Sequence, residues 1–245
     1  MIRKAETMRI SRTAMAVPLA VVLAGAGCAT SGRYVALKEF SVSKLAEESS
    51  PLKGCVVCVK PFASSFSIDE QLPDKNTAEP PNYTYVRPTK EEAKLWDEEV
   101  RHRKKTTSKT DWPQIGYVRN GFGMVMSKVY ALHDPGLWLA DTLRADLQKL
   151  GARVVDSSQE ADADISVCGT IKYFKVDIYM SMWSDLVVDV ELKPKAKTAR
   201  TRPFHTRAAQ VAWIGSSFEF YQSLRECQQK FSRLVIADME LLLKE

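Results

Sequence analysis

The chain has 245 residues, of which 45% are hydrophobic and 27% are charged, a composition that suits one ordinary domain with a buried core. Its formal net charge of +5 is misleading, because residues 1–27 hold four basic residues and one acidic residue. The remaining 218 residues carry 31 basic and 29 acidic side chains, which excludes the strongly basic face of a nucleic-acid-binding protein. After residue 27, no apolar run reaches the roughly 18 residues that a membrane-spanning helix needs.

The N-terminus has the pattern of an export signal. Residues 1–12 are polar and basic, and an almost unbroken apolar stretch follows from Ala14 to Ala26. This stretch suits the hydrophobic region of a secretory signal and is too short to span a bilayer. We therefore expect residues 1–27 to be a signal peptide. Met8 is an alternative start, because Arg9 and Arg12 would still supply the positive charge.

Small residues precede a cysteine in the run Leu23-Ala-Gly-Ala-Gly-Cys28. This run resembles the lipobox of bacterial lipoproteins, in which a small-residue run leads to a diacylated cysteine. The family usually has Leu three residues before the cysteine, where this chain has Gly25, and an ordinary secretory signal is the alternative. The resemblance implies a covalent lipid on Cys28. Ala29 stands where inner-membrane lipoproteins carry Asp, which implies the outer membrane, with the protein lipid-anchored and facing the periplasm.

Residues 28–114 divide into three parts. Residues 28–53 are mostly small or polar and predict a tether between the membrane and a single domain over residues 54–245. The β-branched run Cys55–Phe62 predicts a first strand. Residues 64–114 lose periodicity and predict a long irregular insert, in which a short helix is possible from Thr89 to Arg103.

Two helices and four strands are predicted after the insert. Asp134-Pro135 begins a helix that Gly151 ends. A capping box at residues 216–219 begins a C-terminal helix with one apolar stripe. The strands are expected at residues 152–156, 165–180 with a bulge near Tyr173, 185–193 and 204–213. The order β-α-β-β-β-β-α predicts an α+β fold, with one mostly antiparallel sheet and two helices packed on one face.

Four segments are similar to YajG-type outer-membrane lipoproteins, and the pattern also looks like the periplasmic domains of curli-secretion and ABC-transport auxiliary lipoproteins. The segments are Val56–Phe62, Ile115–Met124, Trp138–Gly151 and Ala161–Thr170. The likeness covers about residues 54–243, and the insert departs from it. It implies an envelope accessory protein without a catalytic site, and it names no substrate.

The glycine-rich run Gly116 to Gly123 lacks the Lys and Ser or Thr that a phosphate loop needs after its last glycine. We expect Gly121 and Gly123 to allow a tight turn that seats Phe122 and Met124 against the core. The alternative is a partner-binding loop made by Arg119, Asn120, Gly121, Phe122 and Gly123.

The other motifs do not predict an enzyme. His102, His133 and His205 have no His or Cys partners at metal-ligand spacing, so we expect solvated or structural histidines, with no metal and no cofactor besides the N-terminal lipid. Cys55 and Cys58 resemble a redox pair, but in a strand they point to opposite faces, about 10 Å apart. We expect structural thiols or a pairing with another strand. The family's architecture implies that the strands of Cys58 and Cys168 are neighbours, so these two sulfurs are a candidate disulfide on the open face of the sheet.

The segment from residue 193 to residue 202 carries five basic residues and no acid, namely Lys193, Lys195, Lys197, Arg200 and Arg202. It predicts a hairpin loop that projects from the domain, and its like charges give the folded state no local gain. The loop is either a solvated tip or a contact with an anionic surface or acidic partner.

These patterns predict a non-enzymatic accessory or structural lipoprotein of an outer-membrane assembly, which works through contacts with an envelope protein or with itself. The alternative is a lipid or glycolipid transport component that holds acyl chains in the cleft between the sheet and the helices or at the glycine-rich loop.

Overall fold

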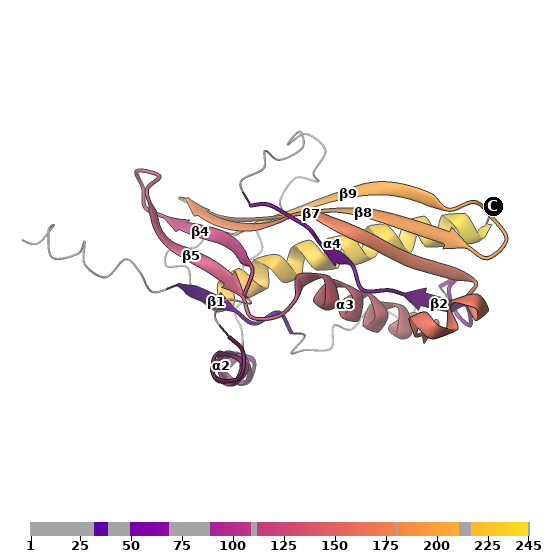
Figure 1. Cartoon of the computed structure of the whole chain (residues 1–245), viewed down its shortest axis with the longest axis horizontal. Coiled ribbons are helices and arrows are strands. Elements are labelled where there is room, and N and C mark those ends of the chain that lie inside the picture. Colours follow the sequence, from indigo (N-terminus) through magenta and orange to yellow (C-terminus); the bar gives the residue numbers. More distant parts are fainter. Residues whose placement is uncertain are drawn as a thin grey trace, which may run out of the picture. The chain divides into compact units, whose positions relative to one another are not determined.

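The computed structural model in Figure 1 describes residues 32–38, 50–68, 89–108, 112–179, 181–210 and 217–244. The folded unit is Gly32–Glu245. The predicted signal peptide and Cys28 lie outside the described residues. None of the described helices is long and apolar enough to cross a membrane.

Nine strands of the described part form one sheet. They are β1 (Arg33–Val35), β2 (Val56–Val59), β3 (Ala63–Ser64), β4 (Gln114–Arg119), β5 (Val125–Ala131), β6 (Arg153–Val155), β7 (Ile165–Tyr179), β8 (Ser181–Pro194) and β9 (Arg200–Gln210). The long strand β7 pairs with β8 along one edge. Along its other edge, β7 pairs successively with β2, β3 and β4. β5 pairs with the far side of β4, and β1 pairs with β5.

The predicted α+β class is confirmed. The prediction of a mostly antiparallel sheet is not confirmed, because the sheet is mixed. The β7–β8, β8–β9 and β4–β5 pairs are antiparallel, because each joins strands that follow one another through a short turn. The β1–β5, β2–β6, β2–β7, β3–β7 and β4–β7 pairs are parallel. These parallel partners are distant in sequence, and no local pattern marks them.

The long hairpin β7–β8 follows its sequence pattern closely. Alternate residues of β8 (Leu186, Val188, Val190 and Leu192) are all buried in the main core. The register of β7 shifts between Ile171 and Tyr173, which confirms the predicted bulge. The last strand begins at Arg200 instead of Phe204, because β9 pairs only with β8 and an edge strand tolerates Pro203.

In the described part of the chain, three α-helices accompany the sheet, together with a short 3-10 helix η4 (Ser157–Asp162). The helix α3 (Pro135–Lys149) begins as predicted, because the Asp134 carboxylate accepts hydrogen bonds from the Gly136 and Leu137 amides. The helix α4 (Ser217–Lys244) contacts β8 and β9, and its apolar stripe, with Phe231, joins the core that α3 also covers (Figure 1). The helix α2 (Lys90–Thr106) begins after a capping box at Thr89, as the possible helix in the insert predicted.

Two predicted boundaries are wrong. Arg33–Val35 is not part of a tether, because it forms β1 beside β5, and Val35, Ala36 and Leu37 are buried. The insert at residues 64–114 is not wholly irregular, since α2 occupies much of it and Trp96 is buried in the main core. Residues 39–49 and 69–88 lie outside the described part of the chain.

Candidate functional site

The strands β4 and β5 form a hairpin whose tip is residues 120–124. Gly123 has a φ of 81°, which favours glycine, and the Asn120 side chain accepts hydrogen bonds from the amides of Phe122 and Met124 at 3.0 Å. The predicted tight turn is therefore correct. The predicted seating of Phe122 and Met124 against the core is wrong, because their side chains are 89% and 59% exposed.

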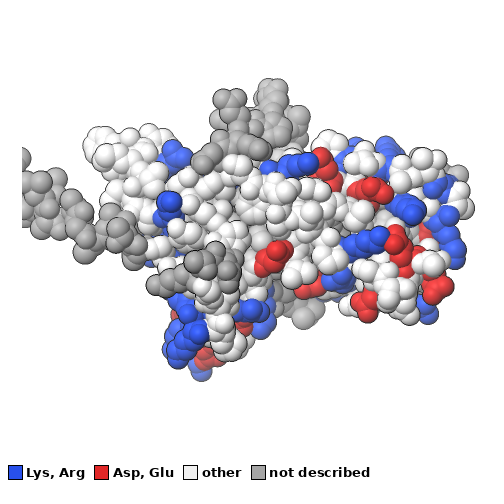
Figure 2. Space-filling view, in the orientation of Figure 1, with Lys and Arg blue, Asp and Glu red and all other residues white. Residues whose placement is uncertain are grey.

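The tip adjoins the face of the sheet opposite α3 and α4. Arg119, at the end of β4, makes a two-point ion pair with Asp177 of β7, with distances of 3.2 and 3.1 Å. A Cβ atom built on Gly123 would lie 3.8 Å from the ring of Tyr179, so the tip approaches the end of β7. Around the hairpin in Figure 2, the surface is white with some blue side chains and no red ones.

Next to the tip, this open face carries a groove of about 390 Å³. Its lining comes from β7, β8 and β9 and consists of Tyr173, Lys175, Asp177, Tyr179, Trp183, Asp185 and Arg207. The Arg207 guanidinium lies 5.4 Å from the centre of the Trp183 ring. Tyrosine, tryptophan and arginine are the residue types most enriched where proteins bind one another.

Ion pairing fixes the floor of this groove. The Asp185 carboxylate accepts two hydrogen bonds from Arg207, at 2.7 and 3.0 Å, and lies 3.3 Å from Nε2 of His205. Burial disfavours its charged form, but the bonds from His205 and Arg207 outweigh burial and lower the pKa of Asp185. Burial, with the charges of Asp185 and Asp177, raises the pKa of Tyr173 to about 12. Asp185 and Tyr173 therefore hold fixed charge states near neutral pH, which suits positioning better than proton transfer.

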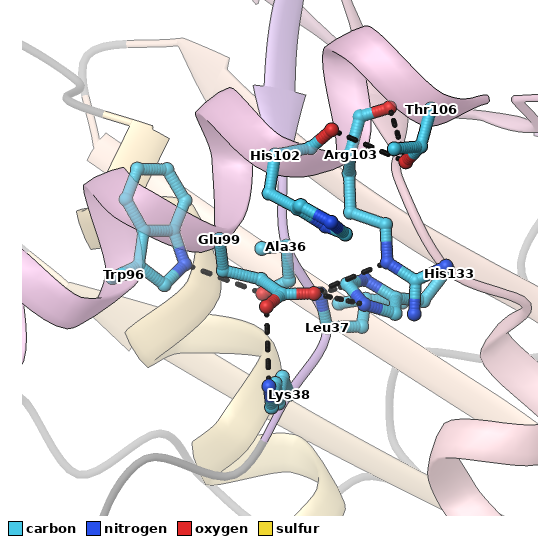
Figure 3. A network of polar contacts seen from close by, with 9 residues as sticks. All are labelled: Ala36, Leu37, Lys38, Trp96, Glu99, His102, Arg103, Thr106 and His133. Atoms are coloured by element: carbon cyan, nitrogen blue, oxygen red, sulfur yellow. Dashed lines mark hydrogen bonds and ion pairs between the residues drawn. The ribbon is translucent and has the colours of Figure 1, made fainter. Parts of the chain in front are cut away.

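A second polar cluster fastens α2 to the rest of the unit. Figure 3 shows the Glu99 carboxylate between Lys38 on one side and Arg103 and His133 on the other, each at 3.1 Å. The Nδ1 atom of His133 accepts a hydrogen bond from the Leu37 amide, so a neutral ring carries its proton on Nε2 and donates to Glu99. The Trp96 indole donates to the carbonyl of Ala36. We call this set of residues the α2 clasp.

Charge states in the α2 clasp follow from these contacts. Burial disfavours the Glu99 carboxylate, but the bonds from Lys38 and Arg103, the charge of Lys38 and the bond from His133 outweigh it and lower the pKa of Glu99 to about 2. Burial and the charge of Arg103 lower the pKa of His133, against the opposing effect of Glu99. A cleft of about 460 Å³ opens beside His133 and the first turns of α3. His133 thus has a structural role; His102, on α2, is exposed.

The predicted disulfide is not formed in the structure, where Cys58 and Cys168 are free thiols. Their strands are neighbours, as expected, with Cys58 opposite Ser166, two residues before Cys168. Cys58 is not on an open surface. It is buried in a small cluster with Val155 and Ala163, and burial raises its pKa. The second cysteine of the apparent redox pair, Cys55, is also a free thiol, and burial raises its pKa.

The basic segment forms the predicted hairpin turn between β8 and β9, but its charges do not all project into solvent. The Arg202 guanidinium lies 2.6 Å from the Asp238 carboxylate of α4, whose side chain is only 5% exposed, and Arg200 lies 4.0 Å from the same oxygen. The Lys197 ammonium donates to the carbonyl of Leu242. The expectation that the folded state gains nothing from these charges is therefore wrong. Lys193 and Lys195 are exposed.

Among the described residues, no group of three or more His, Cys, Asp or Glu side chains is arranged to hold a metal ion. Of the functional features, sequence patterns located the turn at residues 120–124 and the basic hairpin. They missed the open-face groove, whose residues come from three strands. The alternation of Tyr173, Lys175, Asp177 and Tyr179 in β7 was the only local signal for it.

Comparisons with known proteins give a distant likeness. Neither a family model nor a curated protein sequence matches the chain. The chain is similar to a solved Xanthomonas campestris protein of the family DUF330, with a TM-score of 0.49 and 11% identity, over 85% of this chain and 95% of that one. It is also similar to a solved uncharacterized protein, with a TM-score of 0.44 and 12% identity, over 78% of this chain and 96% of that one.

Proposed function

We propose that this chain is an acylated envelope lipoprotein, of the type that YajG represents, which acts as a non-enzymatic accessory or structural component of an outer-membrane assembly. Its anchor is the lipid on Cys28, and its open-face groove binds an envelope protein. The observation that supports this most strongly is the groove itself, in which Trp183 and Tyr179 reach solvent while the charges beneath them are paired within the fold.

The charge states of Asp185, Glu99 and Tyr173 favour a non-enzymatic role, although burial raises the pKa of Asp177 in the same groove. Asp185 is paired with Arg207, and Glu99 with Lys38 and Arg103, so each of these carboxylates is a fixed anion. A general acid or base is most effective when its pKa lies near the working pH. The pKa of about 2 for Glu99 and of about 12 for Tyr173 are far from that range.

The alternative, an acyl-chain carrier, receives less support from the interior. Buried side chains fill the space between the sheet and the helices, and Ile171, Phe174 and Phe231 are among the largest of them. An acyl chain would have to displace this core.

Photo-crosslinking in cells tests the protein contact. A photo-reactive amino acid in place of Trp183 should form an adduct with an envelope protein. The same amino acid in place of Leu241, an exposed residue of α4, should not. Absence of adducts from both positions would contradict the protein contact, and co-purification of lipid with the intact protein would favour the carrier.

The anchor is tested separately. Cys28→Ser should abolish incorporation of labelled fatty acid and leave a precursor that is larger than the mature protein. Normal processing of the variant would contradict the assignment of Cys28.

A further inference from the structure

The tip of the β4–β5 hairpin is apolar on both of its faces. Val125 and Met126 are consecutive in β5, so their side chains point to opposite faces of the hairpin, and they are 50% and 40% exposed. Phe122 and Met124 continue this surface, with 89% and 59% exposed. Exposed apolar side chains on both faces of a tip suit a medium that can surround it, such as the acyl region of a bilayer.

Four of the five backbone amides of the tip are hydrogen-bonded within it. The Asn120 amide donates to the carbonyl of Met124, and the Gly123 amide donates to that of Asn120. The amides of Phe122 and Met124 donate to the Asn120 side chain. Entry into a bilayer requires that polar backbone groups be paired internally, because lipid offers them no partners. These four bonded amides remove part of that cost.

The charges near the tip suit an anionic bilayer surface. Residues 112–133 contain no Asp or Glu, and their only charged side chains at neutral pH are Arg119 and Lys128. Arg119 is paired with Asp177 of β7, so the net positive charge of this hairpin comes from Lys128. Lys128 is exposed on β5, a few residues from the tip. Tyr179 lies beside the tip and is 44% exposed, and tyrosine side chains favour the membrane–water interface.

The position of the tip relative to the anchor follows from strand register. β1 runs parallel to β5, with Arg33 opposite Val129, so the N-terminal end of β1 lies toward the tip end of β5. Cys28 precedes Arg33 by five residues, which extend to about 17 Å at most. Val125, which follows the tip at the start of β5, lies four residues before Val129. Along the strand this places it about 13 Å from Val129, in the same direction as the N-terminal end of β1. The acyl anchor and the tip can therefore reach the same bilayer.

We infer that the hairpin tip, through Phe122, Met124, Val125 and Met126, inserts into the leaflet of the phospholipid bilayer that anchors the protein, as a second and non-covalent membrane contact. The identity of that bilayer rests on the proposed lipid anchor, but the insertion itself does not. Because acyl chains on Cys28 already hold the protein, the role of the tip is to fix its orientation.

Vesicle binding by a chain without the lipid tests the insertion. Residues 29–245 contain the whole folded unit Gly32–Glu245, so this chain can be exported with an ordinary cleavable signal and purified unacylated. The probe is a vesicle of phosphatidylethanolamine and phosphatidylglycerol, and binding is measured by flotation. Phe122→Ser with Met124→Ser should lower the partition coefficient at least tenfold, because two large apolar side chains lose their lipid environment.

A matched control removes two other exposed apolar side chains, Leu95 of α2 and Leu241 of α4, which are 51% and 50% exposed. Leu95→Ser with Leu241→Ser should change the partition coefficient less than twofold. Thermal unfolding of each variant should match that of the unchanged chain, which shows that the fold is intact. Equal loss of binding in both double variants, or no loss in the tip variant, would overturn the inference.

A depth measurement gives a second, independent result. Phe122→Trp should add fluorescence that brominated lipids quench, beyond any quenching of the five native tryptophans. If Phe122→Trp is not quenched and the tip variant instead loses a co-purified protein, then the tip binds a protein and the inference is wrong. Neither result depends on Cys28, whose acylation is measured separately by fatty-acid labelling.

Discussion

Gly116 of β4 lies where no side chain fits. A Cβ atom at this position would approach the carbonyl oxygen of Val176 in β7 to 1.7 Å, a backbone contact that cannot give way cheaply. We expect Gly116→Ala to lower the free energy of unfolding by about 1–3 kcal/mol through overpacking. Gly121→Ala is the control, because nothing lies within 4 Å of its Cβ position, and it should have an effect within about 0.5 kcal/mol. Urea denaturation of the two variants measures the difference.

Acid should weaken the α2 clasp. The folded pKa of Glu99 is about 2 against an ordinary 4.5, so its contribution is fully present above pH 4.5 and is lost as pH falls toward 2. The pKa of His133 is lowered from 6.5, so below that pH the unfolded chain gains a proton that the folded chain resists, and stability falls further. Protonation at Nδ1 also removes the acceptor for the Leu37 amide.

The test of the clasp is denaturation between pH 8 and pH 2 for two variants of α2. Glu99→Gln should lose about 1–3 kcal/mol at pH 7, since charged hydrogen bonds disappear, and its stability should depend less on pH below 4.5. Glu98→Gln, at the adjacent exposed position, should behave as the unchanged chain does. Equal pH profiles for all three proteins would contradict the assigned role of Glu99.

Asp238 of α4 holds the β8–β9 hairpin through its ion pairs with Arg200 and Arg202. Arg202→Gln should lower the free energy of unfolding by about 1–2 kcal/mol, because it leaves a nearly buried carboxylate without its closest cation, although the exposed Arg202 side chain limits the loss. Lys195→Gln removes an equal charge from an exposed position of the same turn and should be neutral within about 0.5 kcal/mol. A double-mutant cycle with Asp238→Asn measures the coupling.

Local patterns predicted the elements that carry their own signals. The helix α3 has its Asp134 cap, α4 has its apolar stripe, and β8 alternates strictly, so each was located from the sequence. β1 was missed because three residues are too few for a pattern, and its strand conformation depends on β5, almost a hundred residues away. The parallel pairs were missed for the same reason, since register between distant strands has no local signature.

At the β4–β5 tip, the turn follows from local sequence, but the exposure of its side chains does not. The turn at Gly121 and Gly123 follows from local conformational preference and was predicted correctly. The burial of Phe122 was inferred from its hydrophobicity, and that inference was wrong because the hairpin extends beyond the core. An apolar side chain indicates burial only in the average case, and exposed exceptions occur where a protein binds something else.

In the folded unit, the apolar β4–β5 tip and the basic β8–β9 turn lie toward opposite ends of the β7–β8 hairpin. The β4–β5 tip lies at the Tyr179 end of β7, and Lys195 follows the other end of the β7–β8 hairpin, about 40 Å away along β8. With the tip in the membrane, a tryptophan introduced by Lys195→Trp should escape quenching by brominated lipids that quench Phe122→Trp. Comparable quenching of both would contradict this orientation. Any anionic surface that Lys193 and Lys195 contact would then lie farther from that bilayer.

The parallel pairing of β1 with β5 also has a mechanical consequence for an anchored protein. A pull on Cys28 that acts along the axis of β1 would load the β1–β5 hydrogen bonds, and the bond from the Leu132 amide to the carbonyl of Val35, in shear. Bonds loaded in shear share the force and must break together, whereas bonds that are peeled apart break one at a time. A three-residue strand arranged in this way can transmit tension between a membrane and a bound partner. The load that it bears depends on its rupture rate under force and not on its equilibrium stability.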